Sequence, residues 1–135
     1  MTQMRPVLQT MLEEIQIAAN ETPHVYFEPP ESVKMSYPCF VYHFTDLNKV
    51  NADDGTYLVS EEYSVRYISK KPDPQIPKAL MMLSRVSFDG HYVVDNLHHF
   101  RFTIRGALNK QEPELVISET VISILGGNND SSYLG

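Results

Sequence analysis

The chain has 135 residues and a formal net charge of −6, with 42% hydrophobic and 21% charged residues. This length fits one domain, and the composition is that of an ordinary globular protein. The acidic balance argues against a general nucleic-acid binder, because such proteins place Lys and Arg against phosphates. No apolar stretch approaches the roughly 20 residues that span a bilayer, so we expect a soluble protein made in the cytoplasm, with no membrane partner.

The first twenty residues predict an amphipathic helix. Apolar residues recur there at spacings of three and four, with Gln and Glu between them. They are Met4, Leu8, Met11, Leu12, Ile15, Ala18 and Ala19. Pro6 fits the first turn of this helix. A short strand is expected at 24–27, and the prolines that follow make 28–38 a loop.

Residues 39–45 and 57–68 predict two strands of an antiparallel hairpin. The first segment is apolar, aromatic or β-branched except for its histidine, and the second mostly alternates with a period of two. Turn-forming residues between them predict a long acidic tip from Asn48 to Thr56, which contains Asp53 and Asp54.

A second helix and a second hairpin are expected next. One face of the helix is marked by Ile76, Ala79, Leu80, Leu83 and Val86. The hairpin joins 88–94 to 97–104 around Asp95 and Asn96. Aromatic and polar residues alternate along its second strand, which predicts one wet face.

After Gly106 the pattern changes, which predicts a domain at 1–106 and a C-terminal extension with a flexible end at 107–135. Within the extension, Leu115–Leu125 predicts a strand that is apolar on both faces and has no obvious partner in the core. The predicted fold class is α+β: an antiparallel or mixed sheet of about four strands, two flanking helices, and a C-terminal arm or extra strand.

The residues give no convincing catalytic or metal constellation. His98 and His99 point to opposite faces of a strand, so at most one of them can join His91, and no other ligand stands at a typical zinc spacing. Cys39 is the only cysteine and is interpreted as a small buried hydrophobe. We therefore predict no metal, no cofactor and no catalysis.

Ordinary structural roles also account for the carboxylate pairs and the tyrosines. The adjacent acids 53–54 and 61–62 are more typical of solvated positions than of a cleft with two separated pKa values. Seven of the eight tyrosines could line a ligand groove, but a small sheet domain needs bulky side chains for its core and its subunit contacts. They are Tyr26, Tyr37, Tyr42, Tyr57, Tyr63, Tyr67 and Tyr92. Core and interface are the expected roles.

Three segments occur in an order that resembles a known family. They are "VYFEPPESVKMSYPCFVY" at 25–42, "PDPQIP" at 72–77 and "SFDGHYVVDNLHHFRFT" at 87–103. Together, over about residues 7–104, they are similar to the tail-terminator or tail-completion proteins of long-tailed bacteriophages. The segments hold turn, core and strand residues and no catalytic signature.

The resemblance implies a structural virion protein made in the host cytoplasm. Copies of such a protein form a closed ring, usually a hexamer, at the head-proximal end of the tail. The ring caps polymerisation of the tail tube protein and joins the tail to the head through a connector protein. DNA passes through the lumen without specific binding, and an acidic lining would not retain it.

Two groups of residues are candidates for these contacts. Asp53 and Asp54 are expected to face the DNA passage or an adjoining ring. The apolar segment of the extension is expected to pack on a neighbouring subunit as an added strand. Its contact residues are Leu115, Val116, Ile117, Val121 and Ile122. The alternative for Asp53 and Asp54 is a tip that is only a solvated turn. The alternative for Leu115–Leu125 is an ordinary edge strand of the chain's own sheet. At the level of function, the alternatives are a head–tail connector or other minor tail protein, and a small ligand-binding or enzymatic α+β domain.

Overall fold

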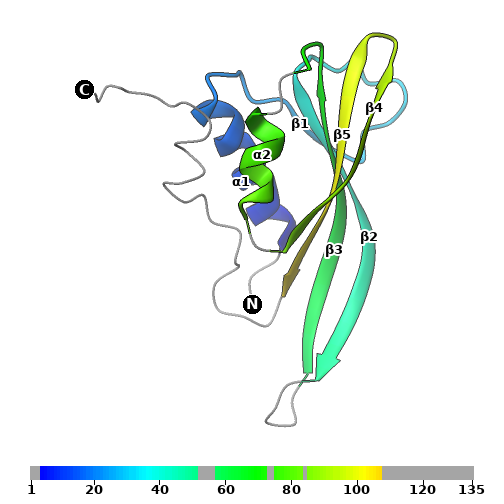
Figure 1. The fold of residues 1–135 in the computed structure, drawn as a ribbon. Coiled ribbons are helices and arrows are strands. Elements are labelled where there is room, and N and C mark those ends of the chain that lie inside the picture. Colours follow the sequence, from blue (N-terminus) through cyan, green and yellow to red (C-terminus); the bar gives the residue numbers. More distant parts are fainter. Residues whose placement is uncertain (1–3, 52–56, 73–74, 84, 108–135) are drawn as a thin grey trace, which may run out of the picture.

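The computed structural model describes residues 4–51, 57–72, 75–83 and 85–107. These residues form a mixed five-stranded sheet of order β1-β2-β3-β5-β4, and two helices cover one of its faces (Figure 1). The elements are α1 (Met4–Ala18), β1 (Val25–Phe27), β2 (Cys39–Asn51), β3 (Tyr57–Ser69), α2 (Gln75–Met81), β4 (Val86–Val94) and β5 (Leu97–Ala107). Neither helix of the described residues has the length and apolar character needed to cross a membrane.

The arrangement confirms the expected α+β class. β1 pairs with β2 in parallel, whereas the other three pairings are antiparallel. The two predicted hairpins are therefore present, and β5 lies between β3 and β4.

The helix α1 uses its apolar stripe as the sequence predicts. Leu8, Met11, Leu12 and Ile15 are fully or almost fully buried and belong to the main core. Complete burial of such a side chain contributes about 1.5–3 kcal/mol, which stabilises a helix too short to persist alone in water.

Alternating residues of the three central strands meet the helices. Because successive side chains of a strand point to opposite faces, one parity of each strand faces the helices. The buried members are Phe40, Tyr42, Tyr63, Val65, Tyr67, Phe100, Phe102 and Ile104. They stand in cross-strand rows, such as Phe40 beside Tyr67 and Tyr67 beside Phe100. Aromatic residues on the helix-covered face of the three central strands thus form much of the core.

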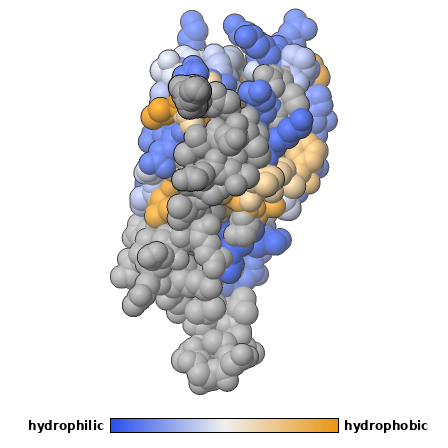
Figure 2. Space-filling model, turned by 60° about the vertical axis from the view of Figure 1, so that its left-hand side comes forward, coloured by the Kyte–Doolittle hydropathy of each residue, from blue (hydrophilic) through white to orange (hydrophobic). Residues whose placement is uncertain are grey.

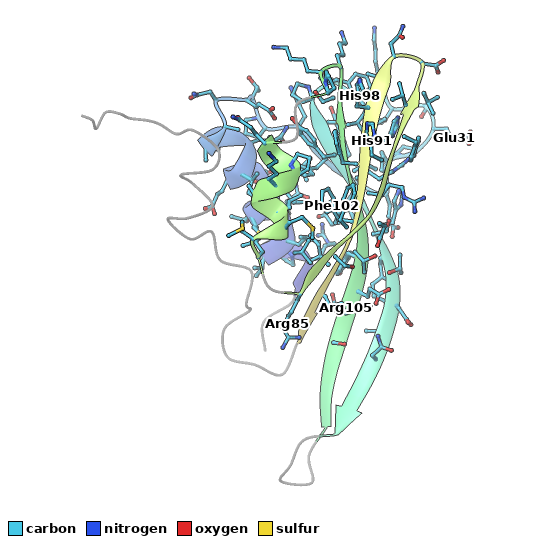
Figure 3. The ribbon with its side chains drawn as sticks, viewed as in Figure 1. Glu31, Arg85, His91, His98, Phe102 and Arg105 are labelled. Carbon is cyan, nitrogen blue, oxygen red and sulfur yellow. The ribbon has the colours of Figure 1, made fainter. Side chains whose placement is uncertain are left out.

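The other face of the sheet is only partly covered. A small cluster of Cys39, Val41 and Ile68 is buried at one end. The loop at 28–38 supplies Met35 and Tyr37 to that cluster, and Figure 3 shows Glu31 of this loop on the side away from the helices. The rest of this face, which we call the open face, carries mainly polar side chains.

The second helix is shorter than predicted. Val86, expected on its apolar face, is the first residue of β4 instead. The amides of Met82 and Leu83 donate to carbonyls three residues back, which tightens the last turn. Arg85 then has a positive φ of 67°, which redirects the chain into the strand.

The first hairpin is longer than predicted. Residues 48–51, expected in a polar loop, belong to β2 and pair with 57–60 of β3. Both strands run on as a narrow projection beyond the layer of helices (Figure 1). The alternation that marks a half-buried strand is missing in 48–51, where neither described helix covers the projection.

The turn of the second hairpin matches its sequence. Asp95 and Asn96 both have positive φ, 53° and 64°, between the paired residues Val94 and Leu97. This is the geometry of a two-residue type I′ turn, in which Asn and Asp tolerate the left-handed region.

Candidate interaction surface

The lone thiol is not placed for chemistry. Cys39 lies buried between Val41 and Ile68 in the small cluster of the open face. Burial raises the pKa of this thiol to about 12, although the nearby Arg66 acts in the opposite direction. A thiol that stays protonated at neutral pH is a poor nucleophile, so its role is packing, as the sequence predicted.

The central tyrosines serve the core rather than a groove. Tyr42 and Tyr67 donate their hydroxyl protons to Gln9 Oε1 and Glu21 Oε2, each over 2.6 Å. Tyr63 donates to Glu61 Oε1 over 2.7 Å. Burial is the main cause that raises the pKa of Tyr42 and of Tyr63. These hydroxyl groups thus have hydrogen-bond partners within the chain.

The three clustered histidines divide between the faces, as predicted. His98 joins His91 on the face that carries the helices, whereas His99 stacks on Tyr92 of the open face, with ring centroids 4.6 Å apart. Among the described residues, no group of three or more His, Cys, Asp or Glu side chains is arranged to hold a metal ion.

His99 stays neutral on the open face. Its Nδ1 is buried and has no hydrogen-bond partner among the described residues. Burial, with smaller effects of Arg66 and His91, lowers the pKa of this imidazole. The ring therefore acts as an uncharged partner of Tyr92.

The open face carries three arginines. Arg66 and Arg101 stand directly opposite each other on β3 and β5, and like charges in such positions are mildly destabilising. Arg105 pairs with Glu62, with 2.8 Å between Nε and Oε1. Arg66 reaches the hydroxyl of Tyr92 over 3.4 Å. This face is thus more basic than the net charge of the chain would suggest.

The outer edge of β4 has no neighbouring strand among the described residues. β4 is the last strand of the sheet, so one side of its backbone from Val86 to Val94 faces outward. A bulge between Phe88 and Gly90 interrupts its pairing with β5. Val93 is 52% exposed and Phe88 is 45% exposed, so this edge offers apolar side chains as well as backbone groups.

A second free edge belongs to β2. Within the described chain, β1 pairs with β2 only along Phe40–Tyr42, so the outer side of β2 beyond Phe44 has no strand partner. Two outward amides are held by carboxylates: Phe44 donates to Glu28 Oε2 over 3.1 Å, and Leu47 donates to Asp46 Oδ1 over 2.8 Å. These solvent-exposed bonds are easily exchanged for bonds to another strand.

The end of the first hairpin extends this edge as an arm. Within the described residues, the pairing of β3 with β5 extends to Ser60 and Ala107, so the described part of the hairpin beyond this pair, 48–51 and 57–59, is a ribbon of two strands for most of its length. An isolated two-stranded ribbon is marginally stable in water, and a third strand is needed for independent stability. The arm, as described, is therefore suited to gain a further strand.

Exposed apolar residues also occur on the helices, but there they are dispersed. Ile17 of α1 is 59% exposed, and Met81 and Met82 are exposed at the end of α2. Figure 2 shows the side that carries the helices, where hydrophobic residues form small patches among hydrophilic ones. A shallow hollow beside α1 contains one carboxylate, that of Glu14, and no second catalytic group.

The interaction residues predicted from sequence lie outside the described residues. They are Asp53, Asp54, Leu115, Val116, Ile117, Val121 and Ile122. The two free edges were not anticipated. The pattern of each strand was visible in the sequence, but the order of strands in the sheet, which decides where the edges lie, was not.

No protein-family model matches the chain, and a search of curated proteins gives no significant match. The resemblance to tail terminators thus rests on the order of the segments quoted above.

Proposed function

We propose that this protein is a structural subunit of a phage tail, similar to a tail terminator, and that its copies close into a ring. The observation that carries the proposal is that, among the described residues, two unlike strand edges have no partner strand: β4 and β2 beyond Phe44, at opposite sides of one sheet. Two different complementary edges favour head-to-tail contacts, and such contacts form a ring when the rotation between neighbours closes.

The pairing has a direct energetic reason. When β4 of one copy adds to β2 of the next, the two-stranded arm gains its third strand and outward backbone groups find partners. Val93 and Leu47, both more than half exposed in the single chain, would then lose contact with water. At about 25 cal/mol for each Å² of apolar surface removed from water, the contact adds hydrophobic to hydrogen-bonding stabilisation.

The resemblance supplies the remaining parts of the proposal. The ring, proposed as a hexamer, caps the tail tube protein, meets a head–tail connector protein and lets DNA pass. The open face carries Arg66, Arg101 and Arg105, whose positive charges attract DNA, so this face does not suit a lumen that must let DNA pass. We therefore assign the acidic lining to Asp53 and Asp54, and an additional subunit contact to Leu115–Leu125.

The test is the oligomeric state of variants with one edge blocked. Lysine on an edge strand disfavours pairing with another strand. Val93→Lys and Leu47→Lys should each abolish rings that the unmodified chain forms, as measured by light scattering after size exclusion and by negative-stain electron microscopy. Ile17→Lys is the matched control, because it places the same charge on an equally exposed apolar position of α1 and should leave the rings intact.

Rings that survive both edge substitutions would contradict the proposed contact. A chain that stays monomeric under all conditions, with tail tube present, would contradict the proposed function. Rings that bind a connector but leave tube length unchanged would favour the connector alternative instead.

A further inference from the structure

Two histidine nitrogens converge at the surface of the second hairpin. Nε2 of His91 on β4 and Nδ1 of His98 on β5 are 3.0 Å apart. The two residues lie beside each other in the half of the hairpin near its turn (Figure 3). His91 is exposed and His98 is half-buried, so solvent and solutes reach the pair.

The rings meet end to end rather than face to face. Their planes differ by 10°, and their centroids are 5.2 Å apart, much farther than the two nitrogens. The nitrogens therefore point toward each other and share one proton, with one ring as donor and the other as acceptor. At least one lone pair is already aimed into the space between the rings.

The strands fix this approach. The residue opposite His98 is Val93, and the residue opposite His91 is Phe100, so the histidines form a diagonal pair on one face. The ring of Phe100 lies 4.7 Å from that of His91 and supports it from one side. The type I′ turn at 95–96 holds the register of both strands. Little conformational freedom remains to be lost when a ligand binds.

The separation suits two ligands of one metal ion. Nitrogens about 2.0–2.1 Å from a metal lie roughly 2.9–3.4 Å apart for angles between octahedral and tetrahedral values. A rotation of each ring about its broad terminal torsion turns both lone pairs toward a common point. Neutral imidazole is a preferred ligand of Zn²⁺, Ni²⁺ and Cu²⁺, and not of Mg²⁺ or Ca²⁺.

We propose that His91 and His98 form a two-nitrogen binding site for a borderline divalent transition-metal ion. Since no third protein ligand stands beside them in the described chain, water fills the other coordination positions. In the neutral pair, the donor ring moves the shared proton through solvent to its own outer nitrogen, so both inner nitrogens bind the metal and each ring then carries its one proton on its outer nitrogen. Because protons compete for the same lone pairs, binding weakens as the pH falls. This site does not depend on ring assembly.

The test is calorimetric titration of the untagged chain with Zn²⁺ and with Ni²⁺ at neutral pH. We expect one ion per chain with a dissociation constant between roughly 1 µM and 1 mM, since the site has half the ligands of a structural zinc site. His91→Gln and His98→Gln should each weaken binding by about tenfold or more, because the second nitrogen binds at high effective concentration. The electron paramagnetic resonance spectrum of the Cu²⁺ complex should show coupling to two nitrogens in the unmodified chain and to one nitrogen in either variant.

Two further variants separate the site from general effects. His43→Gln removes a histidine from β2 and should change nothing. His91→Asp replaces one ligand by another type and should recover part of the Zn²⁺ affinity that His91→Gln loses. Equal affinity in the unmodified chain and in His98→Gln, or an equal loss in His43→Gln, would overturn the proposal.

Discussion

A single buried amide ties the end of α1 to the sheet. Gln16 is 0% exposed although it is polar. Its Oε1 accepts the amide proton of His24 over 2.8 Å, and its Nε2 donates to the carbonyl of Pro38 over 3.1 Å and to Glu21 Oε1 over 3.2 Å. One side chain thus satisfies the backbone before β1 and the backbone before β2.

Gln16→Leu should destabilise the protein by about 2–4 kcal/mol. The substitution keeps the volume but leaves the part-buried N–H of His24 and the part-buried C=O of Pro38 without their side-chain partner, at about 1–3 kcal/mol for each. Denaturant unfolding followed by circular dichroism measures the loss. Glu14→Leu is the control on the same helix, because Glu14 is exposed and water hydrates its surroundings in both variants. An equal loss in both variants would contradict the special role of Gln16.

Sequence alone could not assign this role to Gln16. The helical pattern placed it between apolar residues and marked it as polar, with no sign that it would be buried. Its partners lie 5, 8 and 22 residues away, which only the folded chain brings together. The histidines differ in this respect, because the alternation of a strand was enough to predict that His98 and His99 would separate. The 3.0 Å approach of His98 to His91 depends on cross-strand register and was not predictable.

At the scale of elements, the sequence predicted what local pattern determines. The apolar stripe of α1, the two hairpins and the wet face of β5 were all expected and are present. The predicted ends of both β2 and α2 were wrong, since β2 is longer and α2 is shorter than predicted. β2 continues through polar residues because its ladder with β3 continues there. α2 ends at Met81, after which the amides of Met82 and Leu83 close a tighter last turn before Arg85 takes a positive φ. Both ends are decided by backbone geometry rather than by hydrophobic periodicity.

The turn at the end of the second hairpin gives a test at this scale. Asn96→Ala should destabilise the protein by about 1 kcal/mol, because an alanine pays the steric cost of the left-handed region that Asn tolerates. Asn96→Gly should be neutral or stabilising, since Asp-Gly is a preferred pair for a type I′ turn. Thermal and denaturant unfolding of the two variants measure the difference. If alanine and glycine had the same effect, the conformation at Asn96 would not limit the stability of the hairpin.

At the scale of the whole molecule, the sheet is asymmetric in a way that matters for assembly. One face is closed by helices, and the other is polar and only partly covered. Lateral contact through the edges is the remaining direction in which the sheet can grow. β1 is too short to protect β2 along its length, and β4 has no protecting strand in the described chain. The assembly proposed here uses both edges once in each subunit, which a ring requires.

Because a head-to-tail ring pairs two different edges, a mixture of two variants distinguishes it from a symmetric dimer. Val93→Lys blocks the β4 edge and leaves the β2 edge intact, whereas Leu47→Lys does the reverse. Each variant alone should be monomeric, because every head-to-tail contact then includes one blocked edge. An equimolar mixture of the two should form heterodimers and nothing larger, since one copy supplies an intact β2 edge and the other an intact β4 edge. Light scattering should therefore give about twice the 15.4 kDa mass of the chain. A mixture that stays monomeric would show that the two edges do not meet each other, and a mixture that forms full rings would show that neither substitution blocks its edge.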